Sequence, residues 1–420
     1  MRLLRAFAPA ALALLSGCSS PAPDAESPSS GELDFSERFG SAGDDYARSA
    51  AADAEGAAYV AGFTNGTFEG VESAGDWDAF LTRYGTTGMH DWSLQWGSAG
   101  RDFAQAVLVD GEGAIFVAGY SQGAIDDQSN AGGQDAFLTR VEPGGELGWT
   151  REWGTEQDEF VYAAASNDAG VFVAGYTEGA FAGSTNVGEA DAFVTCFDFA
   201  GEPLWTRQWG TTATDYGQAV HADAFGNVLV AGYTYGALGD ETNLGSQDAF
   251  LIKLDASGEL AWIRQWGSAT TDYGLSVTSD EHGNLYVTGY TYGAVGEQPS
   301  AGVEDAFLSK FDPDGALLWS RQWGTPGADS ARYLTLAPNG DVLVAGDTEG
   351  SFDGYLSAGE RDAFLVRFDS NGEHLSTHQW GTPAQEFSLS VVAVHRDVYV
   401  AGYSETEAPE REALLTKWTF

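Results

Sequence analysis

A Trp-Gly dipeptide recurs along the 420-residue chain at intervals of 56 or 57 residues. It begins at six positions, after an earlier variant Phe39-Gly40: Trp96, Trp153, Trp209, Trp266, Trp323 and Trp380. Two further markers share the period. One is an Asp-Ala-Phe tripeptide, from Asp78 to Asp362 with Glu412-Ala413-Leu414 as a seventh copy, and the other is a glycine after an apolar run, from Gly62 to Gly402. Fixed periods of this size are typical of propellers, solenoids and repeat arrays.

Each repeat contains four short segments with the composition of β-strands. In the second copy these segments cover residues 104–110, 114–121, 135–142 and 147–153, all with β-branched or aromatic residues. Asp-x-x-Gly turns such as Asp110 to Gly113 join the first segment to the second and the third to the fourth. No helix of normal length has room between them. The repeat therefore predicts an all-β fold built from four-stranded antiparallel blades.

The two ends of the repeat region carry complementary parts of one unit. Residues 31–40 match the fourth strand of a repeat, and residues 413–420 match the third. Six whole units and a shared seventh predict a seven-bladed β-propeller over residues 32–420, closed by the N-terminal strand completing the C-terminal blade. Such closure leaves no large unpaired edge, whereas an open array would carry capping repeats at both ends.

A short apolar segment precedes the repeats. Two arginines followed by the ten-residue run from Ala6 to Leu15 predict a signal peptide over residues 1–17, because the run is too short to span a membrane. The sequence Leu15-Ser16-Gly17-Cys18 resembles the bacterial lipobox, which implies a lipid on Cys18; the alternative is an ordinary signal peptide with a chance cysteine. By the same analogy Ser19 implies sorting to the outer membrane. Residues 18–31, rich in Ser, Pro, Ala and acidic residues, predict a flexible tether.

The net charge of the chain is −43, from 19 Lys and Arg against 62 Asp and Glu. This charge argues against a nucleic-acid partner and against binding to an anionic membrane surface other than through the lipid anchor. It favours cations, neutral glycans or basic proteins as partners. Only two cysteines are present, so a disulfide scaffold is excluded. Cys196 stands where other copies carry Arg or Lys, and we interpret it as drift rather than chemistry.

Several motifs that resemble catalytic sites fall at ordinary repeat positions. The segment 119–123, Gly-Tyr-Ser-Gln-Gly, matches a nucleophile elbow, but it has counterparts in other repeats and no helix is expected after it. His374 and His378 could share a strand face, but without a third ligand they are a weak zinc candidate. An acidic residue follows each Trp-Gly start by six positions, and we interpret this set as turn acceptors: Asp45, Asp102, Glu159, Asp215, Asp272, Asp329 and Glu386. The sequence thus predicts no catalytic residue, no metal site and no cofactor.

The order of these motifs resembles a known family. Trp-Gly is followed by Asp-Tyr or Asp-Phe, as at Asp215-Tyr216, then by Val-Ala-Gly-Tyr-Thr and Asp-Ala-Phe-Leu. This succession resembles the bacterial seven-bladed β-propeller repeat known as SBBP, over about residues 33 to 420. The resemblance implies an exported, surface-associated protein, and it implies no particular activity.

Departures from the repeat are the remaining candidates for a ligand site. Tyr235 and Tyr292 occupy equivalent loop positions in adjacent repeats, where others carry Asn, Gln or Glu, and they could stack on a sugar or dock a peptide. Recent duplication of the fourth and fifth repeats is the simpler explanation. Asp347 stands where other repeats have Tyr or Phe, with Arg332 and Asp329 nearby in the repeat, and we expect a local charge cluster there.

Together these features predict a lipid-anchored, monomeric binding or interaction module at the bacterial cell envelope. Its ligand, an unknown protein or glycan, would bind across the loop face or at the mouth of the central channel. The alternative is a propeller enzyme, such as a hydrolase, a lyase or a quinoprotein-type dehydrogenase, with its site at the channel mouth; the fold alone does not establish one. A tight cluster of polar residues around Asp347 and Arg332 at the mouth would favour the enzyme.

Overall fold

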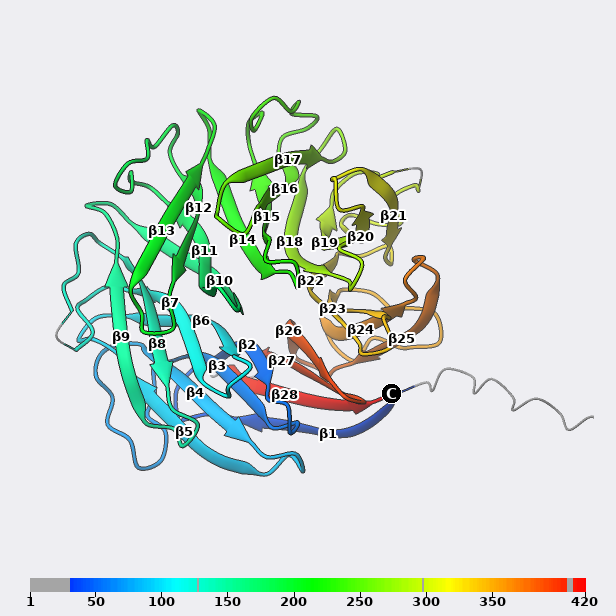
Figure 1. Ribbon diagram of the computed structural model, residues 1–420. Coiled ribbons are helices and arrows are strands. Elements are labelled where there is room, and N and C mark those ends of the chain that lie inside the picture. Colours follow the sequence, from blue (N-terminus) through cyan, green and yellow to red (C-terminus); the bar gives the residue numbers. More distant parts are fainter. Residues whose placement is uncertain (1–30, 127, 297, 406–410) are drawn as a thin grey trace, which may run out of the picture.

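The computed structural model describes residues 31–126, 128–296, 298–405 and 411–420, and it shows seven four-stranded antiparallel sheets arranged in a ring (Figure 1). These sheets are the blades of a propeller, numbered 1 to 7 in chain order below. All regular elements of the described residues are strands. The predicted all-β, seven-bladed propeller is confirmed. Cys18 and its surroundings lie outside the described residues.

In blades 1 to 6 the four strands run in chain order from the centre of the ring to its rim (Figure 1). Blades 1 to 3 consist of β2 (Asp45–Ala52), β3 (Ala58–Thr64), β4 (Asp78–Tyr84), β5 (His90–Trp96); β6 (Asp102–Val109), β7 (Ile115–Ser121), β8 (Asp135–Val141), β9 (Leu147–Trp153); and β10 (Glu159–Asn167), β11 (Gly170–Thr177), β12 (Asp191–Phe197), β13 (Pro203–Trp209). Blades 4 to 6 consist of β14 (Asp215–Ala222), β15 (Val228–Thr234), β16 (Asp248–Leu254), β17 (Leu260–Trp266); β18 (Asp272–Ser279), β19 (Leu285–Thr291), β20 (Asp305–Phe311), β21 (Leu317–Trp323); and β22 (Asp329–Leu336), β23 (Val342–Thr348), β24 (Asp362–Phe368), β25 (His374–Trp380).

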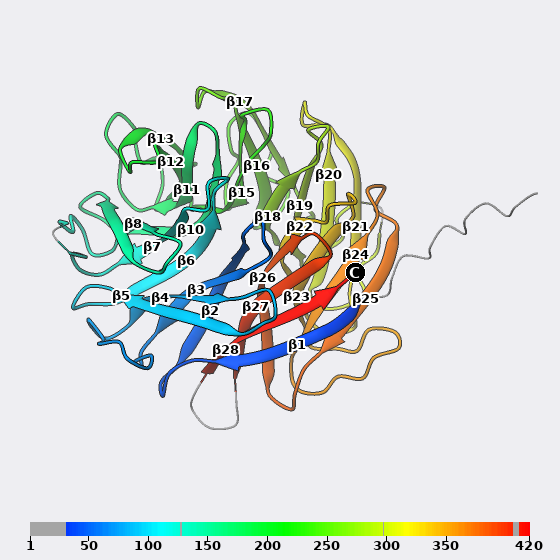
Figure 2. The ribbon, with the colours of Figure 1, turned by 60° about the horizontal axis from the view of Figure 1, so that its bottom comes forward.

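Blade 7 is built from both ends of the repeat region. It consists of β26 (Gln385–Val394), β27 (Asp397–Glu405), β28 (Arg411–Thr419) and β1 (Glu32–Phe39). β1 pairs antiparallel with β28, with Leu33 opposite Trp418 and Phe39 opposite Ala413, and Figure 2 shows the two strands side by side. The predicted closure of the ring by the N-terminal strand is therefore confirmed.

The Asp-x-x-Gly turns close as their sequence predicts. The backbone N–H of Gly113 donates to the Asp110 carbonyl at 3.1 Å, and Gly113 takes a φ of +83°, which favours glycine. The Asp110 carboxylate accepts from the backbone N–H groups of Glu112 at 2.9 Å and Ala114 at 2.8 Å. One side chain and one glycine thus set the tight turn between β6 and β7.

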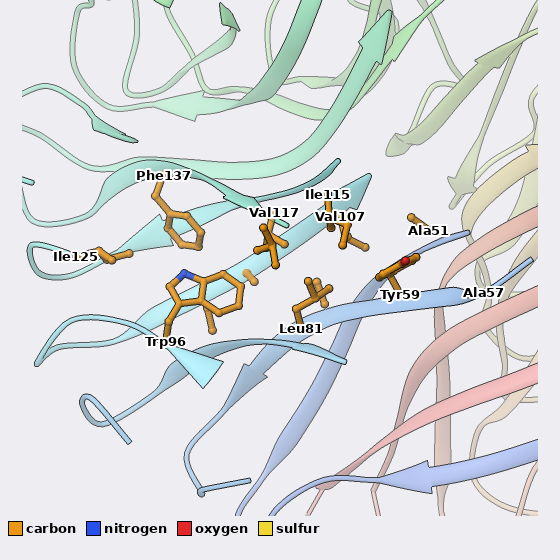
Figure 3. Close-up of a cluster of buried hydrophobic side chains, with 14 residues drawn as sticks. Ala51, Ala57, Tyr59, Leu81, Trp96, Val107, Ile115, Val117, Ile125 and Phe137 are labelled. Carbon is orange, nitrogen blue, oxygen red and sulfur yellow. The ribbon is translucent and has the colours of Figure 1, made fainter. Parts of the chain in front are cut away.

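The hydrophobic cores lie between neighbouring blades. Figure 3 shows one such cluster, where Leu81 and Trp96 of blade 1 face Val117 and Phe137 of blade 2. Cys196 belongs to the equivalent cluster between blades 3 and 4, and burial raises the pKa of its thiol to about 12. No helix in the described part of the chain is long and apolar enough to cross a membrane.

Candidate functional site

The innermost strand of every blade contains a β-bulge at the same repeat position. In β2 the register shifts between Ala47 and Ser49, which leaves Arg48 unpaired, and the other six innermost strands shift at the equivalent residue. A bulge re-aims the side chain it leaves out of the ladder. The seven bulged residues, called the bulge ring below, are Arg48, Gln105, Tyr162, Gln218, Leu275, Arg332 and Leu389. All seven line one cavity of about 160 Å³ in the central channel.

The glycine marker of the repeat explains why the second strand can follow this bulged backbone. Gly62 pairs with Ala47, next to the bulge. A Cβ added at Gly62 would lie 1.8 Å from the carbonyl oxygen of Tyr46, which is closer than any real contact. Only glycine therefore fits at this position, and its period follows that of the bulge.

Aromatic pairs occupy the channel mouth two positions before the bulge. In six blades the innermost-strand residue and its cross-strand partner are both aromatic, with ring centroids 4.6–5.1 Å apart. These twelve residues, called the aromatic collar below, are Tyr46 and Phe63, Phe103 and Tyr120, Phe160 and Tyr176, Tyr216 and Tyr233, Tyr273 and Tyr290, and Phe387 and Tyr403. Every ring is partly exposed, although it lies between buried residues in its strand.

The collar is continuous from blade 7 through blade 1 to blade 5. Rings of neighbouring blades meet edge to face, with centroid separations of 4.5–5.1 Å. Tyr46 meets Tyr403 of blade 7, for example, and Tyr233 meets Tyr273 of blade 5. Eight of the twelve rings are tyrosines, so the collar combines stacking surface with hydroxyl groups.

Blade 6 interrupts the collar with an ionic network centred on a buried carboxylate. Ser330 and Asp347 stand at the collar positions and are both buried. The Arg332 Nε–H donates to Asp347 Oδ1 at 2.9 Å, Arg361 Nη1 pairs with Asp347 Oδ2, and Arg361 Nη2 pairs with Glu349. Burial disfavours the charge on Arg332, but the Asp347 carboxylate together with Tyr290 and Glu304 outweighs burial and raises the pKa of the guanidinium. The structure thus brings Asp347 and Arg332 together at the channel mouth.

The two arginines of blade 6 also bridge the gap in the collar. The Arg332 guanidinium lies over the Tyr290 ring of blade 5, and that of Arg361 lies over the Phe387 ring of blade 7, each with 5.6 Å between the guanidinium carbon and the ring centroid. Cations above aromatic faces are attracted by the ring quadrupole. The ring of contacts around the mouth is therefore completed by cation–π pairs where blade 6 has no aromatic residue.

Tyr235 and Tyr292 extend the collar outward in blades 4 and 5. Their side chains are 44% and 45% exposed. Tyr235 lies 6.5 Å from Tyr216 and from Tyr233, and Tyr292 lies 6.1 Å from Tyr290, measured between ring centroids. Burial, followed by the nearby Glu304 carboxylate, raises the pKa of Tyr292 to about 12. Among the described residues the two rings touch their own blades rather than each other.

Arg48 is a site residue that the sequence reasoning missed. Its Nε–H donates to Gln105 Oε1 at 2.9 Å, and no carboxylate of the described residues lies within ion-pair distance. Burial lowers the pKa of the Arg48 guanidinium, and the positive charge of Arg332 acts in the same direction, against the tyrosine hydroxyls around it. The signal was present in the sequence, because the bulge position is a column of the repeat that holds Arg, Gln, Tyr and Leu without a consensus.

The acidic residues at the strand starts are structural acceptors, as interpreted from the repeat. The Asp102 carboxylate accepts from the Ser98 backbone N–H at 2.7 Å and from the Ser121 hydroxyl. Burial raises the pKa of Asp102, and these hydrogen bonds oppose the shift. Ser121, the serine of the elbow-like motif, is fully buried at the end of β7, and the described residues between β7 and β8 form no helix.

Blade 2 carries one departure that lies away from the channel. In blade 1 the Gln95 amide donates to Asp78 Oδ2 at 2.7 Å, and the same contact occurs in blades 3 to 6. Blade 2 has Glu152 at this position, beside Asp135. Burial, then the negative charge of Asp135, raises the pKa of Glu152 to about 7.

No cluster of three or more His, Cys, Asp or Glu side chains suited to a metal ion occurs within residues 31–420 as far as these are described. His374 donates to or accepts from Thr377 at 2.8 Å, and the His378 ring lies 4.6 Å from that of Trp418. The two histidines are therefore engaged by their own strand and by blade 7.

The SBBP family model, described as a β-propeller repeat, matches residues 261–297, from β17 to β19. The match covers the last strand of blade 4 and the first two strands of blade 5. All seven blades share the four-stranded antiparallel arrangement of blade 5 and the bulge of its innermost strand.

Two curated relatives share sequence with parts of the propeller. The regulatory protein FlaEY of Caulobacter vibrioides is 30% identical over 221 residues, which cover 49% of this chain and 22% of that protein. An uncharacterized WD repeat-containing protein of Acanthamoeba polyphaga mimivirus is 24% identical over 182 residues, covering 34% and 13%. The chain thus spans less than a quarter of the length of either relative.

Solved structures share the fold at low identity. The WD40 domain of Neurospora crassa Pan2 superimposes with a TM-score of 0.50 and 12% identity over 90% of this chain and 89% of that one. A puromycin hydrolase mutant complexed with PGG gives a TM-score of 0.52 and 13% identity over 89% and 52%. At these identities the likeness shows the propeller fold alone.

Proposed function

We propose that this SBBP propeller is a binding module whose ligand, a glycan or a protein segment, docks on the aromatic collar. The observation that carries the proposal is the run of twelve partly exposed rings around one channel mouth. A folded protein normally buries such rings, and tyrosines at a surface are suited to stacking on sugars or on peptide side chains. Tyr235 and Tyr292 enlarge this surface over blades 4 and 5.

A glycan array tests the docking surface. We expect Tyr235→Ala and Tyr292→Ala to weaken binding, because each removes a ring that is about half exposed. Phe225→Ala is the matched control, since Phe225 is 59% exposed on the Asp-x-x-Gly turn between β14 and β15, which lies at the other end of these strands. Unchanged binding by both tyrosine variants would remove these residues from the site.

Export and lipid anchoring at the outer membrane complete the proposal. The support is the apolar leader and the lipobox-like sequence that ends in Cys18. Radioactive palmitate should label the wild type and not Cys18→Ala. Cys196 serves as an internal reference, because its thiol is buried. Equal labelling of both proteins would overturn the anchor.

A propeller enzyme is the second candidate, and the polar network of blade 6 favours it. Asp347, Arg332, Arg361, Ser330 and Glu304 converge at the channel mouth, as the enzyme alternative requires. Both oxygens of Asp347 accept from guanidinium groups, so this carboxylate acts as an ion-pair partner. Glu304, which accepts from the Ser330 hydroxyl, is the acidic group left for chemistry.

Turnover assays separate the two candidates. A panel of glycosides and polysaccharides incubated with the full chain should show no cleavage if the propeller only binds. Cleavage that is lost in Glu304→Gln and kept in the exposed-site control Glu360→Gln would establish the enzyme instead.

A further inference from the structure

The central channel holds a positive charge that no carboxylate neutralises. Arg48 and Arg332 both belong to the bulge ring that lines the 160 Å³ cavity. Arg332 is paired with Asp347, whereas the described residues offer Arg48 only the Gln105 side-chain oxygen. The lining of this cavity contains no Asp or Glu among the described residues. A net charge of about +1 thus lies inside a molecule whose net charge is −43.

A confined guanidinium without a counter-charge is unfavourable, because it has left bulk water without gaining a full set of partners. Fold stability gives no reason for it, since Gln218, Leu275 and Leu389 occupy equivalent bulges without a charge. This unpaired charge favours a role for Arg48 in binding a ligand.

We propose that Arg48 binds the carboxylate of an acidic sugar whose ring stacks on the aromatic collar. This inference rests on the proposed function and names the ligand class for the same site. The Nε–H of Arg48 is held by Gln105, which orients the guanidinium and leaves both Nη groups available. Two parallel N–H groups match the two oxygens of a carboxylate.

Charge and size select the ligand class. One uncompensated charge suits a monoanion, whereas a dianionic phosphate would leave negative charge confined in the channel. The cavity of about 160 Å³ is similar in size to cavities that hold one benzene molecule, so it admits a carboxylate and the ring atoms next to it but not a whole oligosaccharide. Further sugar units would remain at the mouth, where the collar supplies the stacking surface.

The collar and the bulge ring are close enough for one sugar acid to reach both. Each bulged residue follows its collar residue by two positions, which is about 6–7 Å along a strand. The collar hydroxyls of Tyr120 and Tyr403 are electrostatic neighbours of Arg48. The overall negative charge does not prevent binding, because surface charges are screened over ~8 Å at physiological salt.

The test is calorimetric titration of the full chain with glucuronate and with glucose at fixed ionic strength. We expect glucuronate to bind at least tenfold more tightly than glucose, and Arg48→Gln to abolish that difference while leaving glucose binding unchanged. Arg48→Lys keeps the charge and loses the paired donors, so it should retain only part of the preference for glucuronate over glucose. Arg396→Gln controls for net charge, because Arg396 is exposed on the turn between β26 and β27.

Other results of this titration would overturn the carboxylate site. Equal affinity for both sugars, unchanged in Arg48→Gln, would overturn the carboxylate site and leave collar docking intact. Displacement of glucuronate from the wild-type protein by equimolar phosphate would also overturn it, because that result would show a general anion site. If neither sugar binds, the carboxylate site fails, and collar docking is decided separately by the array. Should Arg48→Gln not fold, competition by acetate on the wild type gives the answer: no competition contradicts the site.

Discussion

Blades 5 and 6 are neighbours with the same backbone register, yet they present different chemistry to the channel mouth. In blade 5 the facing collar residues are Tyr273 and Tyr290, a tilted pair 4.6 Å apart. In blade 6 the facing residues are Ser330 and Asp347, which are buried under two arginines. The bulge falls at the same place in both. The residues that fix the backbone of a blade therefore differ from those that set the chemistry of the channel mouth. Side chains at the mouth can change while the strands and the bulge stay the same.

The largest loss of stability is expected from substitution of Asp347 in blade 6. Asp347→Ala leaves Arg332 and Arg361 without their shared partner, and we expect the free energy of unfolding to fall by about 3 to 5 kcal/mol. Chemical denaturation measures the change. Asp353→Ala, an exposed carboxylate of the same blade, should alter stability by less than about 0.5 kcal/mol. Equally small effects of both substitutions would mean that the ionic network adds nothing to the stability of blade 6.

A second contrast separates blade 2 from blade 1 through Glu152 and Gln95. The pKa of Glu152 is raised to about 7 from an ordinary 4.5, so the folded state holds a proton that the unfolded state releases. This contribution to stability is complete below pH 4.5 and is lost as the pH rises through 7, about 2 to 3 kcal/mol in total. Glu152→Gln should therefore stabilise the protein at pH 8 and change little at pH 4.5.

The reverse exchange in blade 1 checks the cause. Gln95→Glu places a carboxylate beside Asp78, and it should destabilise the protein at pH 8 more than at pH 5. Thermal unfolding of both variants across this pH range measures the effect. A pH dependence identical to that of the wild type in both variants would contradict the assignment.

Stacking within the collar has a smaller expected effect. Tyr216 contacts Tyr233 at 4.9 Å in its own blade and Tyr176 at 4.6 Å in blade 3. Tyr216→Leu keeps an apolar side chain and loses both ring pairs, so we expect a loss of about 1 to 2 kcal/mol. A double-mutant cycle with Tyr233→Leu measures the coupling. Additive losses would show that the rings pack without a specific aromatic term.

Tyr235 should show the smallest effect on stability and a clear one on binding. Its side chain is 44% exposed and meets the collar only at its edge. Tyr235→Ala is therefore expected to change the free energy of unfolding by less than about 0.5 kcal/mol. A large loss of stability would identify Tyr235 as a packing residue and would remove the argument for a docking surface in blade 4.

Much of the fold was predictable because it depends on local chemistry repeated seven times. The Asp110 turn, the Asp102 acceptor and the matching of residues 31–40 to a fourth strand all follow from short segments. Asp347 and Arg332 could be placed together because their repeat positions fall on adjacent strands.

The rest of the site depends on contacts made outside the paired strands or between blades, which the strand pattern of one repeat does not encode. Arg361 reaches Asp347 from outside the strands, and Arg48 meets Gln105 across a blade boundary. The bulge itself leaves no local sequence mark beyond the glycine opposite it. A column of unlike residues at one repeat position was the available signal, and its meaning appears only when seven such residues meet around an axis.

The shared blade 7 also has a kinetic consequence. Ser36 of β1 and Thr416 of β28 are separated by 380 positions along the chain, yet their hydroxyls lie 3.2 Å apart. A pairing over such a separation has the highest loop-closure cost in the molecule and forms late in folding. The ring must therefore stay open until β28 has been synthesised. Until β28 pairs with β1, blade 7 lacks one of its four strands and the ring is not locked.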